Sequence, residues 1–186
     1  MNASLTLSHN DIRNTTLDCD SLGIHYQVMS DIGLLATGKN TQIRRWDNQL
    51  RQFIPVAEWE RHSFESDVFK FPNGRTFPVS TFMSSNRGFA KIERTFVGDD
   101  GRRYSWLART SELTAYSSEN DSMGAPIAKF HSRRILFGRR NASLELFPGY
   151  EKTLDTLVLT FLYVEYKRRQ SRNASASAGA GAASAC

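Results

Sequence analysis

The sequence contains little cysteine, and its first residues carry no export signal. Only Cys19 and Cys186 occur in the 186 residues. Two cysteines form neither a disulfide framework nor a structural zinc site, which takes four ligands. The N-terminal residues MNASLTLSHND have neither the basic start nor the apolar stretch of a signal peptide. We therefore expect an intracellular protein of the cytoplasm, free in solution or attached peripherally to a membrane, without a transmembrane segment.

Motifs of known enzymes and cofactor sites are also missing. The chain has no G-x-S-x-G, no phosphate-binding P-loop and no G-x-G-x-x-G. The histidines lack the H-x-H or H-x-x-x-H spacing of metal ligands and stand at His9, His25, His62 and His131. Asp18–Gly23 begins like a calcium loop, but Leu22 and Met29 occupy positions that need oxygen ligands. We expect no catalytic residue, no metal and no cofactor, although a site assembled from distant residues stays open.

Positive charge is present in modest excess. The formal net charge is +5 and the isoelectric point is about 9.4, with acidic residues interspersed among the basic ones. A nucleic-acid binder usually concentrates its basic residues, so nucleic acid is a disfavoured partner. The expected partner is an anionic membrane surface or a protein.

Several arginines occur as doublets, such as Arg44-Arg45 and Arg133-Arg134. Neighbours in a strand point to opposite faces, so a doublet places one arginine on each face. Planar guanidinium groups bind phosphate through two hydrogen bonds. We predict that arginines of distant strands form a site for an anionic headgroup, and the candidates are Arg44, Arg94, Arg103 and Arg133. Ordinary solvated surface charge is the competing interpretation.

Short strand signals fill the middle of the chain. The candidate strands are Ile24–Ser30, Gln42–Asp47, Phe64–Phe71, Thr76–Met83, Lys91–Val97, Arg102–Ala108, Leu113–Ser118, Pro126–Ser132 and Ala142–Phe147. Glycines at both ends of the loop 98–101 favour a hairpin. Pro78 lacks the N–H that a central strand donates, which indicates an edge strand or a bulge. About ten short strands at this spacing are typical of an all-β barrel or sandwich.

The last structured element is predicted to be a helix over Glu151–Arg169. Its apolar run, Leu154–Tyr166, is longer than a usual buried strand. Acidic residues in the first turns and basic residues in the last complement the helix dipole. The run spans about 20 Å at 1.5 Å per residue, whereas a bilayer core needs about 30 Å. We therefore expect this helix to lie inside the protein, with a β-barrel as its natural surroundings.

The chain changes character after the helix. From Ser171 onward it reads SRNASASAGAGAASAC, without a large apolar residue. Such a segment buries too little surface to offset the entropy lost on ordering. We therefore predict one domain over residues 1–170 and a disordered tail over residues 171–186.

The C-terminal residues also carry a family resemblance. The stretch Ser143–Pro148 ends in Phe-Pro and is followed by Asp155 and the apolar run Leu157–Val164. This arrangement resembles the tubby C-terminal-like superfamily, which includes tubby, LURP-one-related and phospholipid scramblase proteins. More closely, residues 5–169 resemble an uncharacterised domain family of mushroom-forming fungi. The resemblance implies a closed antiparallel β-barrel of about ten to twelve strands around a C-terminal hydrophobic helix, and leaves the function open because one fold serves many functions.

These features predict a non-catalytic binding module. Its expected ligand is an anionic lipid headgroup, of the phosphoinositide kind, or a protein partner. Two further function classes stay open: an enzyme with an unrecognised site acting on a phosphorylated substrate, and a structural or oligomerising β-domain.

Overall fold

The computed structural model describes residues 2–31, 39–88, 91–109, 112–119, 122–133 and 140–182. Within them the strands are β1 (Ala3–Leu7), β2 (Thr15–Cys19), β3 (Ile24–Ser30), β4 (Asn40–Asp47), β5 (Gln52–Glu60), β6 (Val68–Lys70), β7 (Thr76–Pro78), β8 (Met83–Gly88), β9 (Lys91–Val97), β10 (Arg103–Ala108), β11 (Leu113–Glu119), β12 (Ser122–His131) and β13 (Ser143–Leu146). The helical elements are a 3-10 turn η1 (Asp20–Leu22), a short helix α1 (Val79–Phe82) and a long helix α2 (Leu154–Ala182).

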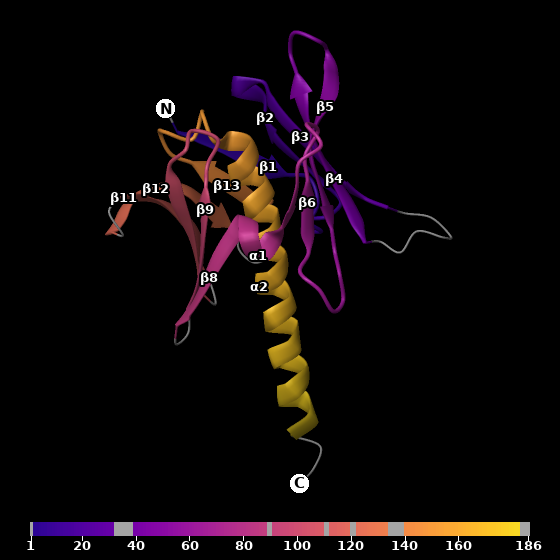
Figure 1. The fold of residues 1–186 in the computed structure, drawn as a ribbon, viewed down its shortest axis with the longest axis vertical. Helices are drawn as coiled ribbons and strands as arrows, with labels where there is room; N and C mark the ends of the chain where they lie inside the picture. The colour runs from indigo at the N-terminus through magenta and orange to yellow at the C-terminus, as the bar shows by residue number, and fades with distance from the viewer. Residues whose placement is uncertain are drawn as a thin grey trace.

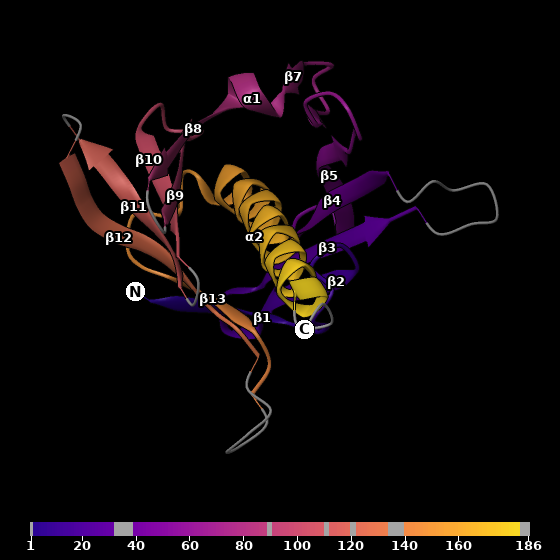
Figure 2. The ribbon, with the colours of Figure 1, turned by 90° about the horizontal axis from the view of Figure 1, so that it is seen from below.

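The strands form one antiparallel sheet built from two meanders. The order across the sheet is β7-β6-β5-β4-β3-β2-β1-β13-β12-β11-β10-β9-β8. Each meander, β1–β7 and β8–β13, pairs strands that follow one another along the chain. The first and last strands join the two meanders, with Leu5 of β1 opposite Leu144 of β13. Figures 1 and 2 show the sheet curled around α2, which lies along its concave side.

The core consists of the concave face of the sheet and the first half of α2. In β1, buried and exposed residues alternate because successive side chains of a strand point to opposite faces. On α2, by contrast, Leu157, Val158, Leu159, Phe161 and Leu162 are each at most 1% exposed, although they point around the whole helix. The prediction of a buried helix over Leu154–Tyr166 is therefore confirmed.

Polar contacts fix the position of α2 within this apolar surrounding. The indole N–H of Trp106 donates to Thr160 Oγ1 over 2.9 Å. In the first turn, Asp155 accepts a hydrogen bond of 2.5 Å from the Tyr26 hydroxyl and lies 2.9 Å from Arg45 Nη1. These contacts tie the helix to β10 on one side and to β3 and β4 on the other.

The closed barrel expected from the resemblance is not found. Over the part of the chain that the structure describes, β7 and β8 form no ladder with each other, so both are edges of the sheet. Proline has no N–H to donate, and Pro78 ends the three-residue strand β7. The following residues form α1, which Figure 2 shows between the two edges. The edge strand expected at Pro78 is confirmed.

Other elements also differ from the sequence-based expectation. The sheet has thirteen strands rather than ten to twelve, and β1, β2, β5 and β8 were not foreseen as separate strands. The strand expected over Phe64–Phe71 is limited to β6.

Helix α2 continues past the expected end at Arg169 to Ala182. Extending an existing helix adds one backbone hydrogen bond per residue without a new nucleation step, which is consistent with the longer helix. Side chains 170–176 are exposed, and disorder of the tail in solution stays a prediction. No helix in the described ranges has both the length and the apolar character needed to cross a membrane.

Candidate functional site

The structure does not bring the four predicted arginines together. Arg44 lies on the outer face of β4, where its Nη2 donates to Gln42 Oε1 over 2.7 Å. Arg94 of β9 lies on the concave side, 5.1 Å from the centroid of the Tyr163 ring of α2. Arg103 and Arg133 are exposed at the start of β10 and beyond the end of β12. Because they lie on different faces and strands, these arginines do not form one phosphate site.

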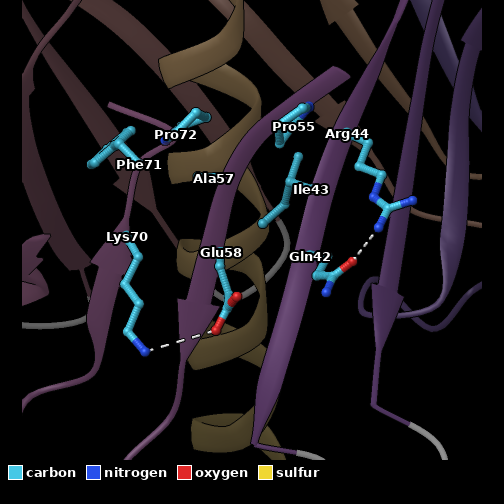
Figure 3. Close-up of a pocket in the computed structure, with 9 residues that line it drawn as sticks. All are labelled: Gln42, Ile43, Arg44, Pro55, Ala57, Glu58, Lys70, Phe71 and Pro72. Atoms are coloured by element: carbon cyan, nitrogen blue, oxygen red, sulfur yellow. Dashed lines mark hydrogen bonds and ion pairs between the residues drawn. The ribbon is translucent and has the colours of Figure 1, made fainter. Parts of the chain in front are cut away.

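Arg44 borders a groove on the outer face of β4, β5 and β6, with a volume of about 260 Å³. Figure 3 shows Arg44 on one side of this groove and Lys70 on the other. Lys70 Nζ lies 2.7 Å from Glu60 and 3.8 Å from Glu58, and Arg44 is held by Gln42. An anion entering here would therefore meet two carboxylates beside the lysine. The groove is poorly suited to phosphate.

Arg94 instead belongs to a group of cations and rings at the end of the sheet where α2 leaves it. Lys167 Nζ lies 5.5 Å and 5.8 Å from the centroids of the Tyr163 and Tyr166 rings. The guanidinium of Arg13 lies 5.5 Å from the Tyr166 ring. Cations at such distances from a ring are attracted to its π electrons. We call this group the cation–aromatic cluster; its members are Arg13, Arg61, Arg94, Lys167, Trp59, Tyr163 and Tyr166.

Arg61 is the buried cation of the cluster. Its guanidinium lies 5.1 Å from the Trp59 ring and 5.8 Å from the Tyr166 ring, and the residue is 8% exposed. Arg61 Nη1 donates to Thr41 Oγ1 over 2.5 Å. Nη2 is also buried, but it has no hydrogen-bond partner among the described residues. A buried donor without a partner costs about 1–3 kcal/mol. An acceptor that bound Nη2 would remove this cost.

Asp67 is the buried counter-ion of the cluster. Its side chain is 2% exposed and lies 2.9 Å from Lys167 Nζ. It also accepts hydrogen bonds from the indole N–H of Trp59, over 3.4 Å, and from the backbone N–H of His62, over 3.1 Å. These donors occupy Asp67, which is therefore committed to the lysine and the surrounding chain.

The remaining cations leave the cluster with surplus positive charge. Asp11 lies 3.5 Å from Arg13 Nε, whereas Arg61 and Arg94 form no ion pair with any residue in the described ranges. Burial lowers the pKa of the Arg61 guanidinium and the charge of Arg13 lowers it further, whereas Tyr166, Asp67 and Asp11 only partly offset this change. The first effect is the cost of removing a charge from water, and the second is the repulsion between like charges. An anion placed here would reduce that repulsion.

Sequence spacing explains how the cluster forms. Trp59 and Arg61 are two residues apart at the end of β5, so their side chains share one face. The N–H of Arg61 donates to the Lys39 carbonyl over 2.9 Å, which continues the pairing of the two strands. Tyr163 and Tyr166 are three residues apart and share a face of α2.

Arg13, Arg61 and Lys167 are not members of arginine doublets and were therefore not foreseen. The local signal for Arg61 is a single cation two residues from an aromatic residue in a strand. The contact between β5 and α2 has no such local signal, because Trp59 and Tyr166 are far apart in the chain.

The donors of the cluster determine what it can bind. Guanidinium and ammonium groups donate hydrogen bonds and carry positive charge, and they bind the oxygens of phosphate, sulfate and carboxylate groups. In the described ranges, no group of three or more histidine, cysteine or acidic side chains has the arrangement of a metal site.

Comparison with known proteins adds one finding. The model of a family described as "Family of unknown function (DUF6593)" matches residues 10–170, which is most of the chain. No curated protein and no solved structure matches the chain significantly.

Proposed function

The chain belongs to the Family of unknown function (DUF6593), and on that premise we propose from its structure that it is a non-catalytic module binding phosphate-bearing molecules. The proposed site is the cation–aromatic cluster. The observation that carries the proposal is the buried guanidinium of Arg61, whose Nη2 has no hydrogen-bond partner among the described residues and which lies beside the charge of Arg13.

A phosphate group would satisfy two requirements of the cluster at once. Its oxygens would accept a hydrogen bond from Arg61 Nη2, and its negative charge would offset the repulsion between Arg61 and Arg13, which both lie within 6 Å of the Tyr166 ring. Guanidinium groups already positioned by rings and by Thr41 lose little conformational freedom on binding.

The graded exposure of the cations favours a ligand that arrives from solvent. The side chains of Arg13 and Lys167 are 35% and 32% exposed, whereas Arg61 is buried. We propose that the phosphate belongs to an anionic headgroup at a cytoplasmic membrane surface, to which the protein binds peripherally. A soluble phosphate compound or a protein partner would be detected as a different outcome of the same test.

A helix surrounded by a curled antiparallel sheet is consistent with the tubby-like architecture that the resemblance implies. We propose that the two folds are related, with α1 standing where a closed barrel would pair the two edge strands, β7 and β8.

Arg13→Ala tests the site, and Arg133→Ala is its matched control. Arg13 belongs to the cluster, whereas Arg133 is exposed and lies outside it. We expect Arg13→Ala to weaken binding of a soluble inositol phosphate about tenfold, the loss of one charged hydrogen bond. Arg133→Ala should change the affinity by less than about twofold. Isothermal titration calorimetry of the full chain measures both.

Vesicles distinguish the sources of the phosphate. Cosedimentation with phosphoinositide-containing vesicles, but not with phosphatidylcholine vesicles, supports the headgroup. Binding of the inositol phosphate without vesicle binding assigns the site to a soluble compound. The proposal is overturned if the wild-type chain binds neither, or if Arg133→Ala weakens binding as much as Arg13→Ala.

A further inference from the structure

Two adjoining hollows lie at the opposite end of the buried part of α2, where the sheet is not closed. They are bordered by the β6–β7 hairpin, α1, the β9–β10 turn and the first turn of α2, with volumes of about 520 Å³ and 170 Å³. Phe71, Asp99 and Thr156 line both hollows, which identifies their junction. We call the combined space the seam cleft. Its outer hollow has the size of a small-molecule site.

Three phenylalanines form one wall of the seam cleft. The ring centroids of Phe71, Phe77 and Phe82 are 5.7–6.0 Å apart. All three side chains are half-buried, so part of this aromatic surface is accessible. The inner hollow ends at Leu159, which is 1% exposed. Such walls favour a ring or a short apolar chain, because its burial removes apolar surface from water.

A carboxylate lies where the two hollows meet. Asp99 is exposed and accepts a hydrogen bond of 2.8 Å from Thr156 Oγ1. It forms no ion pair with a described residue, whereas the neighbouring Asp155 is paired with Arg45. Burial raises the pKa of Asp155, and the negative charge of Asp99 raises it further. The junction therefore carries uncompensated negative charge.

We propose that the seam cleft binds a small aromatic molecule carrying a protonated amine, with the ammonium group at Asp99 and the ring against Phe71, Phe77 and Phe82. The charge of the ligand follows from its neighbours. A ligand anion at the junction would face both Asp99 and Asp155, which already occupy the positive end of the α2 dipole. Arg75, the cation of the outer hollow, is exposed and lies over the Phe77 ring, 4.9 Å from its centroid.

This site is independent of the proposed phosphate site. Thr156 and Tyr166 are ten residues apart on α2, which corresponds to about 15 Å along the helix axis. The ligand classes also carry opposite charges. Each site can therefore be lost while the other remains.

Two probes of similar shape and opposite charge test the proposal: 2-phenylethylamine and 3-phenylpropionate. We expect saturable binding of the amine to the full chain in a calorimetric titration, with the acid at least about tenfold weaker. Asp99→Asn should weaken binding of the amine by about tenfold or more, since it removes the charge. Asparagine keeps an oxygen that accepts from Thr156, so the melting temperature should stay close to that of the wild type.

Arg75→Gln is the comparison variant. It removes a positive charge from the outer hollow, so it should not weaken binding of the amine. Tighter binding of the acid, no binding of the amine, or unchanged affinity in Asp99→Asn would each overturn the proposal. A loss of affinity in Arg75→Gln equal to that in Asp99→Asn would also contradict the assignment of Asp99. None of these results bears on Arg13 or the inositol phosphate.

Discussion

At the scale of single residues, charged side chains hold α2 at both ends of its buried part. Asp155 in the first turn is bound by Tyr26 and Arg45, and Lys167 in the last buried turn is bound by Asp67. The two acids differ in their accessibility. The Asp155 side chain is 31% exposed and borders the seam cleft, whereas Asp67 is almost completely enclosed. Of the two acids, Asp155 is therefore the one that exchanges protons with solvent more directly.

The raised pKa of Asp155 predicts a pH effect on stability. Because the folded chain holds this proton more tightly than the unfolded chain, the resulting stabilisation is complete below the unfolded value of 3.8 and is lost as the pH rises through the folded pKa. Asp155→Asn does not titrate. Its free energy of unfolding should therefore improve relative to the wild type as the pH rises above about 4, as measured by urea unfolding at each pH.

The contributions of other acidic residues to the pH dependence of stability are the same in both proteins and cancel in this comparison. Hydrogen bonds from Lys70 and Lys129 hold the pKa values of Glu60 and Glu112 below their usual range, so these groups make both proteins more stable as the pH rises from the acid side. Only the difference between the two proteins reports on Asp155. If the free energy of unfolding of the wild type instead increases relative to that of Asp155→Asn as the pH rises, the result would contradict a raised pKa of Asp155.

At the scale of elements, the burial of α2 on all sides makes it the least replaceable part of the fold. Leu162 is 1% exposed, and aspartate at this position would place an unpaired carboxylate in the core. We expect Leu162→Asp to cost at least about 4–5 kcal/mol and to abolish cooperative unfolding, as measured by circular dichroism. Leu50→Asp makes the same chemical change where the leucine is 61% exposed, and should change stability by less than about 0.5 kcal/mol. A folded Leu162→Asp would contradict the packing described for α2.

The C-terminal end of the same helix should be dispensable. The side chains of residues 171–176 are exposed, and alanine-rich sequence needs no tertiary contact to extend a helix. Deletion of residues 171–186 should therefore leave the melting temperature almost unchanged in a thermal scan. A clear decrease would show that the extension packs against the domain.

At the scale of the whole molecule, the sequence predicts the individual strands and the helix better than it predicts whether the sheet closes into a barrel. Alternation and turn residues identify β3 and β9 at their observed bounds, and the long apolar run identifies the buried half of α2. Pro78 marks an edge, yet a local pattern does not show whether another strand will pair with that edge. Closure depends on β7 and β8, which α1 separates.

The candidate site was less predictable for the same reason. Doublets of arginine are visible in the sequence, but which arginine of a doublet faces the concave side depends on the assembled sheet. Regular alternation along β4 places Ile43 and Arg45 on the concave side, where Arg45 reaches Asp155, and Arg44 on the outer side. The partners of Arg61 come from β4, β5 and α2, and only the assembled fold brings them together.

The central claim is that phosphate binds at the cation–aromatic cluster, and side-chain NMR tests it most directly. The Nε–H signals of the arginines, assigned in nitrogen-15-labelled protein, can be followed during titration with a soluble inositol phosphate. We predict saturable shifts of Arg13, Arg61 and Arg94, with the signals of Arg103 and Arg133 unchanged. Shifts confined to Arg44, Arg103 or Arg133, or no shift at all, would contradict the account.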